Sequence, residues 1–395
     1  MKNKIVSGLG QLGTREIQRV TTPVDEHRIC FESKPDFSDN AWALFQYLIK
    51  NGYNRDYKIC WIADRESKKV SGIPNVKVIL RQNRTEVVKA LYASKFVFYT
   101  HTLSGWIRPK KDQTVVNLWH GCGYKASRNA GVNRRSNIKA IMNSGKMVFD
   151  KVLVPGQAFI KAKSVFFQCS EEKVIPIGYP RYDLFRQPCG NWDQAAQEWG
   201  CQGKKVVIWM PTYRNTGDSS FKEGNMKNKY WLPLLTGDQD LEWLDEVCTV
   251  NGIVLLIKKH RLQSVFLKNK MKSIVFIDDS DLERLGIQLY EMLPHTDALV
   301  TDYSSVAVDY LLLDKPMAFT LDDYEEYAQV RGFVFEDAKK YMPGSHVLNL
   351  NDLETFMAQI SRSEDLCREK RLEVLPELQN PCENYSERIV RYFGI

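Results

Sequence analysis

Short apolar runs recur along this chain at intervals that suit alternating strands and helices. The first series covers residues 28–32, 57–62, 76–80, 96–100, 115–119, 152–154 and 174–177. The second series covers residues 205–210, 253–257, 274–277, 298–301, 317–320 and 347–350. This alternation predicts an α/β fold in which helices cover parallel sheets.

A polar, turn-rich segment, Gln187-Pro188-Cys189-Gly190-Asn191, separates the two series. The 395 residues also exceed what one hydrophobic core normally supports. We therefore predict two domains, residues 1–186 and 187–395, with a cleft between them. A last helix, predicted over 385–393, could pack on either domain.

One strand-to-helix turn is a candidate binding site. The apolar run 298–301 leads into Asp302-Tyr303-Ser304-Ser305, and the apolar block 306–313 is long enough for a helix that Asp314-Lys315-Pro316 ends. At the start of that helix the hydroxyls, the backbone N–H groups and the helix dipole favour an anion such as phosphate. The alternative is that Ser304 and Ser305 only cap the helix.

Polar residues also follow other predicted strands, and parallel strands bring such turns to one edge of a sheet. His120 and Gly121 follow the run 115–119, whereas Thr212 and Arg214 follow 205–210. The run 253–257 is followed by Lys259, His260 and Arg261. Basic groups and histidine at one edge predict a site for a diphosphate nucleotide.

His120 and His260 differ in their settings. A neutral imidazole at His120 could take a proton from a hydroxyl nucleophile, although a hydrogen-bonded structural histidine is the alternative. His260 lies between two cations, so it is better suited to hydrogen-bond a phosphate or a leaving group. Arg214 can grip phosphate oxygens through two N–H groups, or pair with Asp218. This positive charge would make a divalent metal dispensable, so we predict no metal. His27, His101, His295 and His346 have no setting like those of His120 and His260, and we assign them no role.

The net charge is +7, from 55 basic and 48 acidic residues, and its excess is unevenly distributed. Between 125 and 151 the one acid is Asp150, while the basic residues are Lys125, Arg128, Arg134, Arg135, Lys139, Lys146 and Lys151. This segment is either a solvated face or the contact for a polyanion, namely nucleic acid, an anionic membrane or a phosphate-rich substrate. Its single aromatic residue, Phe149, argues against single-stranded nucleic acid.

Targeting and redox signals point to the inside of the cell. No apolar run approaches the length of about 18 residues that a membrane span needs, and the N-terminal segment lacks the apolar core of a signal peptide. The nine cysteines form no CxxC pair, which predicts reduced thiols.

Six blocks, in order, resemble the CDP-glycerol glycerophosphotransferase family of teichoic acid primases and polymerases. They are Phe31-Glu32-Ser33 with Ser38-Asp39-Asn40, Trp119-His120-Gly121 to Lys125, Gly178-Tyr179-Pro180-Arg181, Pro211-Thr212-Tyr213-Arg214, Thr301-Asp302-Tyr303-Ser304-Ser305 with Asp309 and Lys315-Pro316, and Glu325-Glu326-Tyr327 with Arg331-Gly332-Phe333. The resemblance implies a GT-B-like fold, with two Rossmann-like domains facing a central cleft. It also implies that an acceptor hydroxyl attacks the glycerol-bearing phosphorus of CDP-glycerol and releases CMP, without a cofactor.

By motif, His120 matches the proposed base and His260 a second histidine near the donor pyrophosphate. The donor-binding set that we predict is Gly121, Thr212, Arg214, Lys259, Arg261, Asp302, Ser304 and Ser305. An undecaprenyl-diphosphate-linked acceptor would meet the first domain.

The family works at the cytoplasmic face of the membrane without spanning it. The basic residues Lys125, Arg128, Arg134, Arg135 and Lys139 would contact anionic headgroups or the acceptor there. Cys122-Gly123-Tyr124 departs from the family pattern, which leaves the acceptor open. A CDP-ribitol donor and a nucleotide-sugar glycosyltransferase of the same fold are the alternatives.

Overall fold

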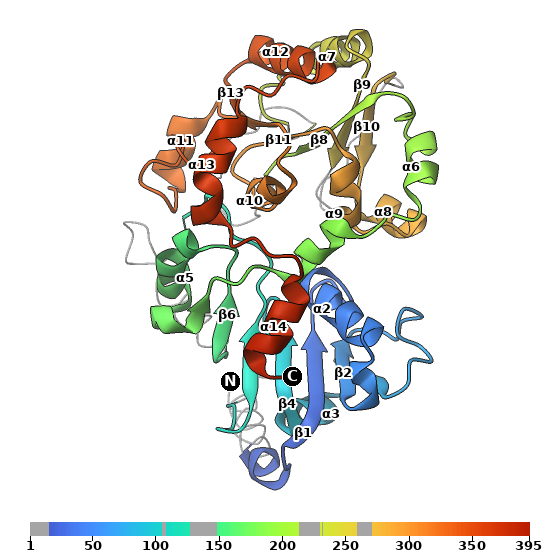
Figure 1. Cartoon of the computed structure of the whole chain (residues 1–395), viewed down its shortest axis with the longest axis vertical. Coiled ribbons are helices and arrows are strands. Elements are labelled where there is room, and N and C mark those ends of the chain that lie inside the picture. Colours follow the sequence, from blue (N-terminus) through green and yellow to red (C-terminus); the bar gives the residue numbers. More distant parts are fainter. Residues whose placement is uncertain (1–15, 105–107, 127–147, 213–229, 231, 259–270) are drawn as a thin grey trace, which may run out of the picture.

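The computed structural model describes residues 16–104, 108–126, 148–212, 230, 232–258 and 271–395. The described chain forms two lobes, each built on one parallel sheet (Figure 1). The strands of the first lobe are β1 (Asp25–Glu32), β2 (Lys58–Ala63), β3 (Val76–Leu80), β4 (Ser94–Tyr99), β5 (Thr114–Asn117), β6 (Lys151–Leu153) and β7 (Val174–Ile175). Those of the second are β8 (Lys205–Met210), β9 (Ile253–Lys258), β10 (Ile274–Ile277), β11 (Ala298–Thr301), β12 (Met317–Thr320) and β13 (Ser345–Val347).

Both sheets have the same doubly wound order. The first runs β3-β2-β1-β4-β5-β6-β7 and the second β10-β9-β8-β11-β12-β13, and every pair of neighbouring strands is parallel. The predicted α/β class with two parallel sheets is therefore confirmed. In such sheets the order reverses between β1 and β4, and between β8 and β11, which is where ligands bind at the carboxyl ends of the strands.

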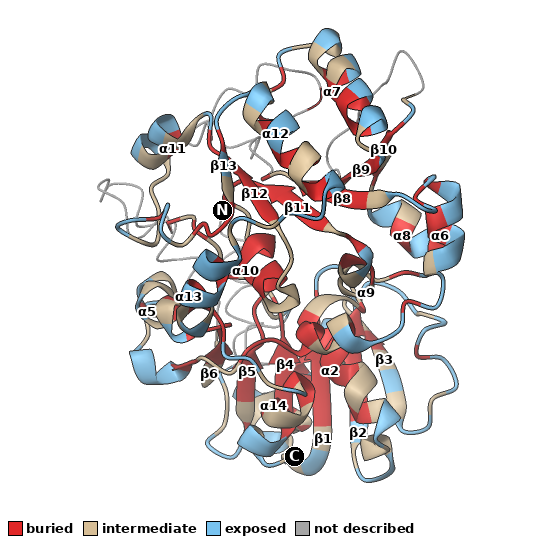
Figure 2. Ribbon diagram, turned by 45° about the horizontal axis from the view of Figure 1, so that its top comes forward, coloured by how far each residue is buried: buried red, intermediate tan, exposed pale blue. Residues whose placement is uncertain are grey.

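Helices cover the faces of the sheets, so the central strands are buried on both sides (Figure 2). This burial explains why the strands appear in the sequence as nearly continuous apolar runs. The longer helices are α2 (Asp39–Lys50), α3 (Arg84–Ala93), α5 (Ile160–Phe167), α7 (Asp238–Val250), α12 (Leu350–Ser361), α13 (Arg368–Leu378) and α14 (Tyr385–Phe393). The shorter helices are α6 (Trp192–Glu198), α8 (Asp279–Leu285), α9 (Leu289–Met292), α10 (Val306–Tyr310) and α11 (Tyr324–Val330). Several 3₁₀ segments connect them: η1 (Tyr53–Arg55), η3 (Gln157–Phe159), η4 (Glu171–Lys173), η5 (Pro180–Arg186), η6 (Leu293–His295) and η7 (Leu311–Leu313).

The strand predicted over 347–350 was wrong in its bounds. The strand ends at Val347, and Leu350 is already the first residue of α12. The Asn349 side chain accepts a hydrogen bond of 3.1 Å from the backbone N of Asp352. An asparagine in this capping position starts a helix, and this local preference outweighs the apolar pattern.

The last helix, which the sequence left unassigned, packs on the first lobe. The Phe393 ring of α14 lies 6.1 Å from the Phe98 ring of β4. The Asp183 carboxylate of η5 accepts hydrogen bonds from the backbone N of Tyr385, at 2.6 Å, and of Ser386, at 2.8 Å. The predicted range 187–395 thus contains a helix that belongs spatially to the first lobe.

Candidate active site

The two lobes meet where the loop after β5 contacts the turn after β11. A Cβ atom built on Gly121 would lie 2.7 Å from Ser305 Oγ, and one on Gly123 would lie 2.9 Å from the Ser305 backbone N. Only glycine permits such an approach, and Gly121 also has a φ of +150°. The structure therefore brings the predicted residues His120, Gly121 and Ser305 together.

On the second-lobe side, a buried carboxylate joins the ends of two neighbouring strands. Asp302 has no solvent exposure, and its Oδ1 accepts a hydrogen bond of 2.9 Å from the Thr212 backbone N. Thr301 Oγ1 donates a bond of 2.7 Å to the Met210 carbonyl oxygen. The predicted residues Thr212, Asp302, Ser304 and Ser305 thus share one edge, where Asp302 positions the Thr212 backbone.

The helix predicted over 306–313 is present, as α10 followed by η7. It ends at Asp314, whose φ of +46° is left-handed. The side chain of Ser305, at the N-cap position, makes no capping hydrogen bond. This geometry disfavours the purely capping alternative for Ser305 and leaves its hydroxyl beside Gly121.

On the first-lobe side, side chains hold a strained backbone in place before His120. Trp119 has a φ of +54°, an uncommon value for a bulky residue. The backbone N–H of Trp119 donates to Asn117 Oδ1 at 2.8 Å, and its backbone carbonyl accepts from Asn40 Nδ2 at 2.8 Å. Arg181 Nη1 donates to the His120 carbonyl oxygen at 2.8 Å. Such over-determined strain is typical of functional sites.

The His120 imidazole stacks on a second histidine. The rings of His101 and His120 are 4.1 Å apart and inclined by 9°. Burial, the neighbouring His101 and the cation of Lys163 hold the pKa of His120 well below its ordinary value, in that order of importance. The imidazole is therefore neutral at pH 7. From the sequence we assigned His101 no role, although it follows β4, the strand beside β5, and its position could have indicated this contact.

A buried ion pair joins the two lobes next to this site. Arg181 Nη2 of η5 donates to Asp309 Oδ2 of α10 at 2.7 Å, and Arg181 Nη1 donates to Asp39 Oδ1 at 2.7 Å. The hydroxyls of Tyr182 and Tyr290 also donate to Asp309, which has no solvent exposure. Burial raises the pKa of Asp309, and Arg181 opposes that rise. Sequence reasoning noted both residues in motifs but missed their pairing.

The Cys122-Gly123-Tyr124 segment connects the lobes. Tyr124 is fully buried, and its ring packs edge-on against Phe319. Its carbonyl accepts a hydrogen bond of 2.7 Å from the Val334 backbone N. Lys125 forms an isolated bridge with Phe333. Lys125, predicted as an acceptor or membrane contact, is therefore placed at the lobe boundary.

Several predicted site residues lie outside the described residues. They are Arg214, Lys259, His260 and Arg261 on the donor side, and Arg128, Arg134, Arg135 and Lys139 in the basic segment.

Among the described residues, Asp278 caps α8 and Asp279 pairs with Lys258 at 2.6 Å. No group of three or more His, Cys, Asp or Glu side chains in the described part of the chain could hold a metal ion. None of the described helices is long and apolar enough to cross a membrane.

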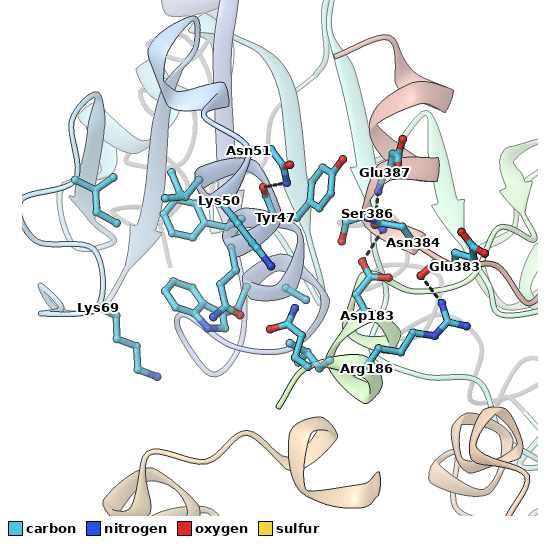
Figure 3. A pocket seen from close by; sticks show the side chains of 18 residues that line it. Tyr47, Lys50, Asn51, Lys69, Asp183, Arg186, Glu383, Asn384, Ser386 and Glu387 are labelled. Carbon is cyan, nitrogen blue, oxygen red and sulfur yellow. Dashed lines mark hydrogen bonds between the residues drawn. The ribbon is translucent and has the colours of Figure 1, made fainter. Parts of the chain in front are cut away.

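A cavity of about 730 Å³ lies elsewhere (Figure 3). It is bounded by α2, the end of η5 and the start of α14, and it contains no predicted site residue. Asp183 accepts the backbone N–H groups that begin α14, while Arg186 donates to the Cys382 carbonyl at 3.0 Å. Several of its polar groups thus serve the fold. The candidate active site is therefore the contact between Gly121 and Ser305.

Two doubly wound lobes that meet at the carboxyl ends of their strands define the GT-B-like class. The chain belongs to the CDP-glycerol:poly(glycerophosphate) glycerophosphotransferase family, whose model matches residues 15–392.

Curated relatives agree with this assignment. The chain is 26% identical over 335 residues to the teichoic acid ribitol-phosphate polymerase TarL of Staphylococcus aureus, a match that covers 82% of this chain and 54% of TarL. It is 28% identical over 339 residues to the teichoic acid poly(glycerol phosphate) polymerase of Bacillus spizizenii, covering 82% and 80%. The chain thus spans little more than half the length of TarL.

Solved structures share the fold. A structure of the wall teichoic acid polymerase TagF superposes with a TM-score of 0.75 at 20% identity, covering all of this chain and 97% of that one. A TagF variant with CDPG gives the same TM-score and identity, covering 100% and 98%.

Proposed function

We propose that this protein transfers a polyol phosphate, glycerol phosphate in the first instance, from a CDP-activated donor to a hydroxyl of a lipid-linked acceptor. The acceptor oxygen forms a bond to the polyol-bearing phosphorus while the bond from that phosphorus to the bridging oxygen breaks. The acceptor proton passes to a base, and CMP leaves with the bonding electron pair. The product belongs to teichoic acid or a related cell-wall polymer.

One observation carries the proposal: the contact between Gly121 and Ser305 places the His120 loop against the serine turn. His120 is the base in this mechanism. The depressed pKa of His120 supports that role, because a neutral imidazole can accept a proton at neutral pH. Its ring is fixed by the stack on His101, and its carbonyl by Arg181.

The second lobe binds the donor. Thr212, Ser304 and Ser305 offer hydroxyl and backbone donors to the diphosphate, and Asp302 holds the Thr212 backbone in place. Arg214, Lys259, Arg261 and His260 complete this set in our proposal. They would supply the positive charge and the hydrogen bond to the leaving phosphate.

The polyol that the donor carries has more than one candidate. The relatives include both ribitol-phosphate and glycerol-phosphate polymerases, so CDP-ribitol is the second candidate. A nucleotide-sugar donor is the third, because the GT-B-like fold by itself does not fix the donor.

We also propose that the protein works as a peripheral protein at the cytoplasmic face of the cell membrane. The excess of basic residues between 125 and 151 supports this location, since anionic headgroups attract such segments. An undecaprenyl-diphosphate-linked acceptor would be reached from that surface.

A donor panel tests the proposal. Purified protein is incubated with CDP-glycerol, CDP-ribitol or a UDP-sugar, each with a lipid-linked acceptor, and CMP or UDP release is measured while products are resolved by mass. We expect CMP release that depends on the acceptor, with an acceptor mass increased by one polyol phosphate. UDP release with sugar transfer, or no acceptor-dependent CMP release from either CDP-polyol, would refute it.

A further inference from the structure

A second groove, of about 320 Å³, lies beside α5 at the lobe boundary, and we call it the α5 groove. The residues that line it include Lys125, Lys161, Lys163, Val165, Phe166 and Val334. Among the described residues, three cations line it and no acidic side chain does. In the part of the chain that the structure describes, neither Lys161 nor Lys163 forms an ion pair. The groove therefore favours an anion.

The α5 groove adjoins the proposed base. Lys163 Nζ lies 4.8 Å from the centre of the Trp119 ring, which is itself 4.0 Å from the His120 ring. Lys163 is also close enough to depress the pKa of His120. A phosphate held by Lys163 would thus lie next to the imidazole, on the first-lobe side of the cleft.

An apolar wall accompanies these cations. Val165 is 44% exposed, and Phe166 lies beside it in the groove. Val334 of the second lobe contributes to the lining, in a segment that the Tyr124 carbonyl holds. Exposed apolar surface next to lysine side chains suits a ligand with an anionic head and a hydrocarbon chain.

The larger groove in Figure 3 has a different character. It also contains two lysines, Lys50 and Lys69, but acidic residues stand among its lining, namely Asp183, Glu383 and Glu387. Lys69 Nζ lies 5.7 Å from the centre of the Trp42 ring. The lysines of this groove lie among carboxylates. Replacing them is therefore a matched control for the loss of two lysines outside the α5 groove.

We propose that the α5 groove binds the acceptor substrate, taking a phosphate group of the acceptor at Lys161 and Lys163 and the adjoining part of its apolar chain along Val165 and Phe166. This inference rests on the proposed function, because it assigns a subsite to the acceptor of that reaction. It predicts that an acceptor needs both parts, the phosphate and the chain, to bind well.

Binding is measured by titration calorimetry without donor, using dodecyl phosphate below its micelle concentration. Inorganic phosphate and dodecyl maltoside are the comparison probes, and phosphatidylglycerol vesicles report membrane contact by pelleting. We compare the wild type with Lys161→Ala/Lys163→Ala and with the control Lys50→Ala/Lys69→Ala. A second pair, Val165→Glu and the distant exposed control Val250→Glu, tests the apolar wall.

We expect dodecyl phosphate to bind at least tenfold more tightly than either comparison probe. The α5 lysine pair should weaken it at least tenfold and Val165→Glu about fivefold or more, with both controls within twofold of wild type. Equal binding of inorganic phosphate, or an unchanged affinity in the α5 variants, would overturn the inference. So would a loss of vesicle pelleting with intact dodecyl phosphate binding, which would make the groove a membrane contact.

Because no donor is present, this result is independent of the donor panel. Failure of every CDP-polyol in the panel refutes the proposed function without altering the measured affinities. Failure of the α5 variants to change binding refutes the acceptor subsite while leaving acceptor-dependent CMP release intact.

Discussion

The two sides of the cleft are built in different ways. On the first-lobe side, a strained backbone presents one neutral imidazole. Hydrogen bonds with three side chains, Asn40, Asn117 and Arg181, hold that backbone in place. On the second-lobe side, a buried carboxylate, Asp302, organises a turn that presents hydroxyl groups. The first arrangement suits proton transfer and the second suits holding an anion. Substitutions on the first side should therefore change kcat and the pH profile, and those on the second the KM of the donor.

The largest effect should come from His120→Asn. Loss of the base should lower kcat by about 10²- to 10⁴-fold, which is the usual contribution of general base catalysis. The donor KM should change little, because the second lobe is untouched. Steady-state CMP release checks this, with His27→Asn, in the exposed start of β1, as the control. Near-normal turnover of His120→Asn would remove the distinction between the two sides.

Asp309→Ala tests how the sides are held together. Removing one partner of a buried ion pair leaves the other charge uncompensated, which typically costs about 3–5 kcal/mol. Arg181 would keep Asp39 but lose Asp309 and the contact between the lobes. Urea titration measures the loss in the free energy of unfolding. Glu198→Gln, in an exposed pair with Arg284, should leave the urea midpoint unchanged. Equal midpoints for the two variants would contradict the proposed role of the pair.

Gly121→Ala should force the sides apart. Its methyl carbon would lie 2.7 Å from Ser305 Oγ, so either the His120 loop or the serine turn must move. A displacement of about 1 Å in an active site can cost about 10²-fold in rate, and we expect a loss of that order in kcat/KM. Gly72→Ala is the control, since Gly72 also has a positive φ but no neighbour within 4 Å of the added carbon. If both variants lose the same activity, backbone strain and not the contact is responsible.

Ser305→Ala should affect the second side alone. A hydrogen bond to a charged group contributes about 1.5–3 kcal/mol, so the donor KM should rise at least about tenfold while kcat stays within about threefold. Initial rates over a range of CDP-polyol concentrations separate the two constants, with Ser361→Ala as a remote control. A fall in kcat at unchanged KM would instead place Ser305 in the chemical step.

The smallest effect should come from His101→Asn and appear in the pH profile. Protonated His120 cannot act as a base, so activity is lost as the pH falls through the pKa of His120. That pKa is depressed, so the acidic limb of kcat/KM for the wild type lies below the ordinary histidine range. Removing His101 removes one cause of the depression, so the limb should move to higher pH. His346→Asn is the control; an unmoved limb in His101→Asn would show that the stack does not tune His120.

Much of the architecture could be predicted because its causes are local. Parallel strands buried on both faces need apolar runs, and β3, β8 and β10 have the bounds that their runs predicted. Other runs missed their bounds: β5 and β7 end two residues before their runs do, and the run 347–350 shares only Val347 with β13. In the last case the capping preference of Asn349 outweighed hydrophobicity. The turn residues of the site were found because polar groups at the ends of parallel strands share an edge.

The sequence by itself determined the α/β class, the polar turns and, through its ordered motifs, the family. Only the tertiary structure decided that Gly121 touches Ser305, that His101 stacks on His120, that Arg181 pairs with Asp309 and that α14 returns to the first lobe. These contacts join residues that are far apart along the chain or that lie on neighbouring strands. Hydrophobic periodicity shows only on which side of its own helix or strand a residue lies. Which partner lies opposite depends on how the whole chain packs, and no local pattern encodes that.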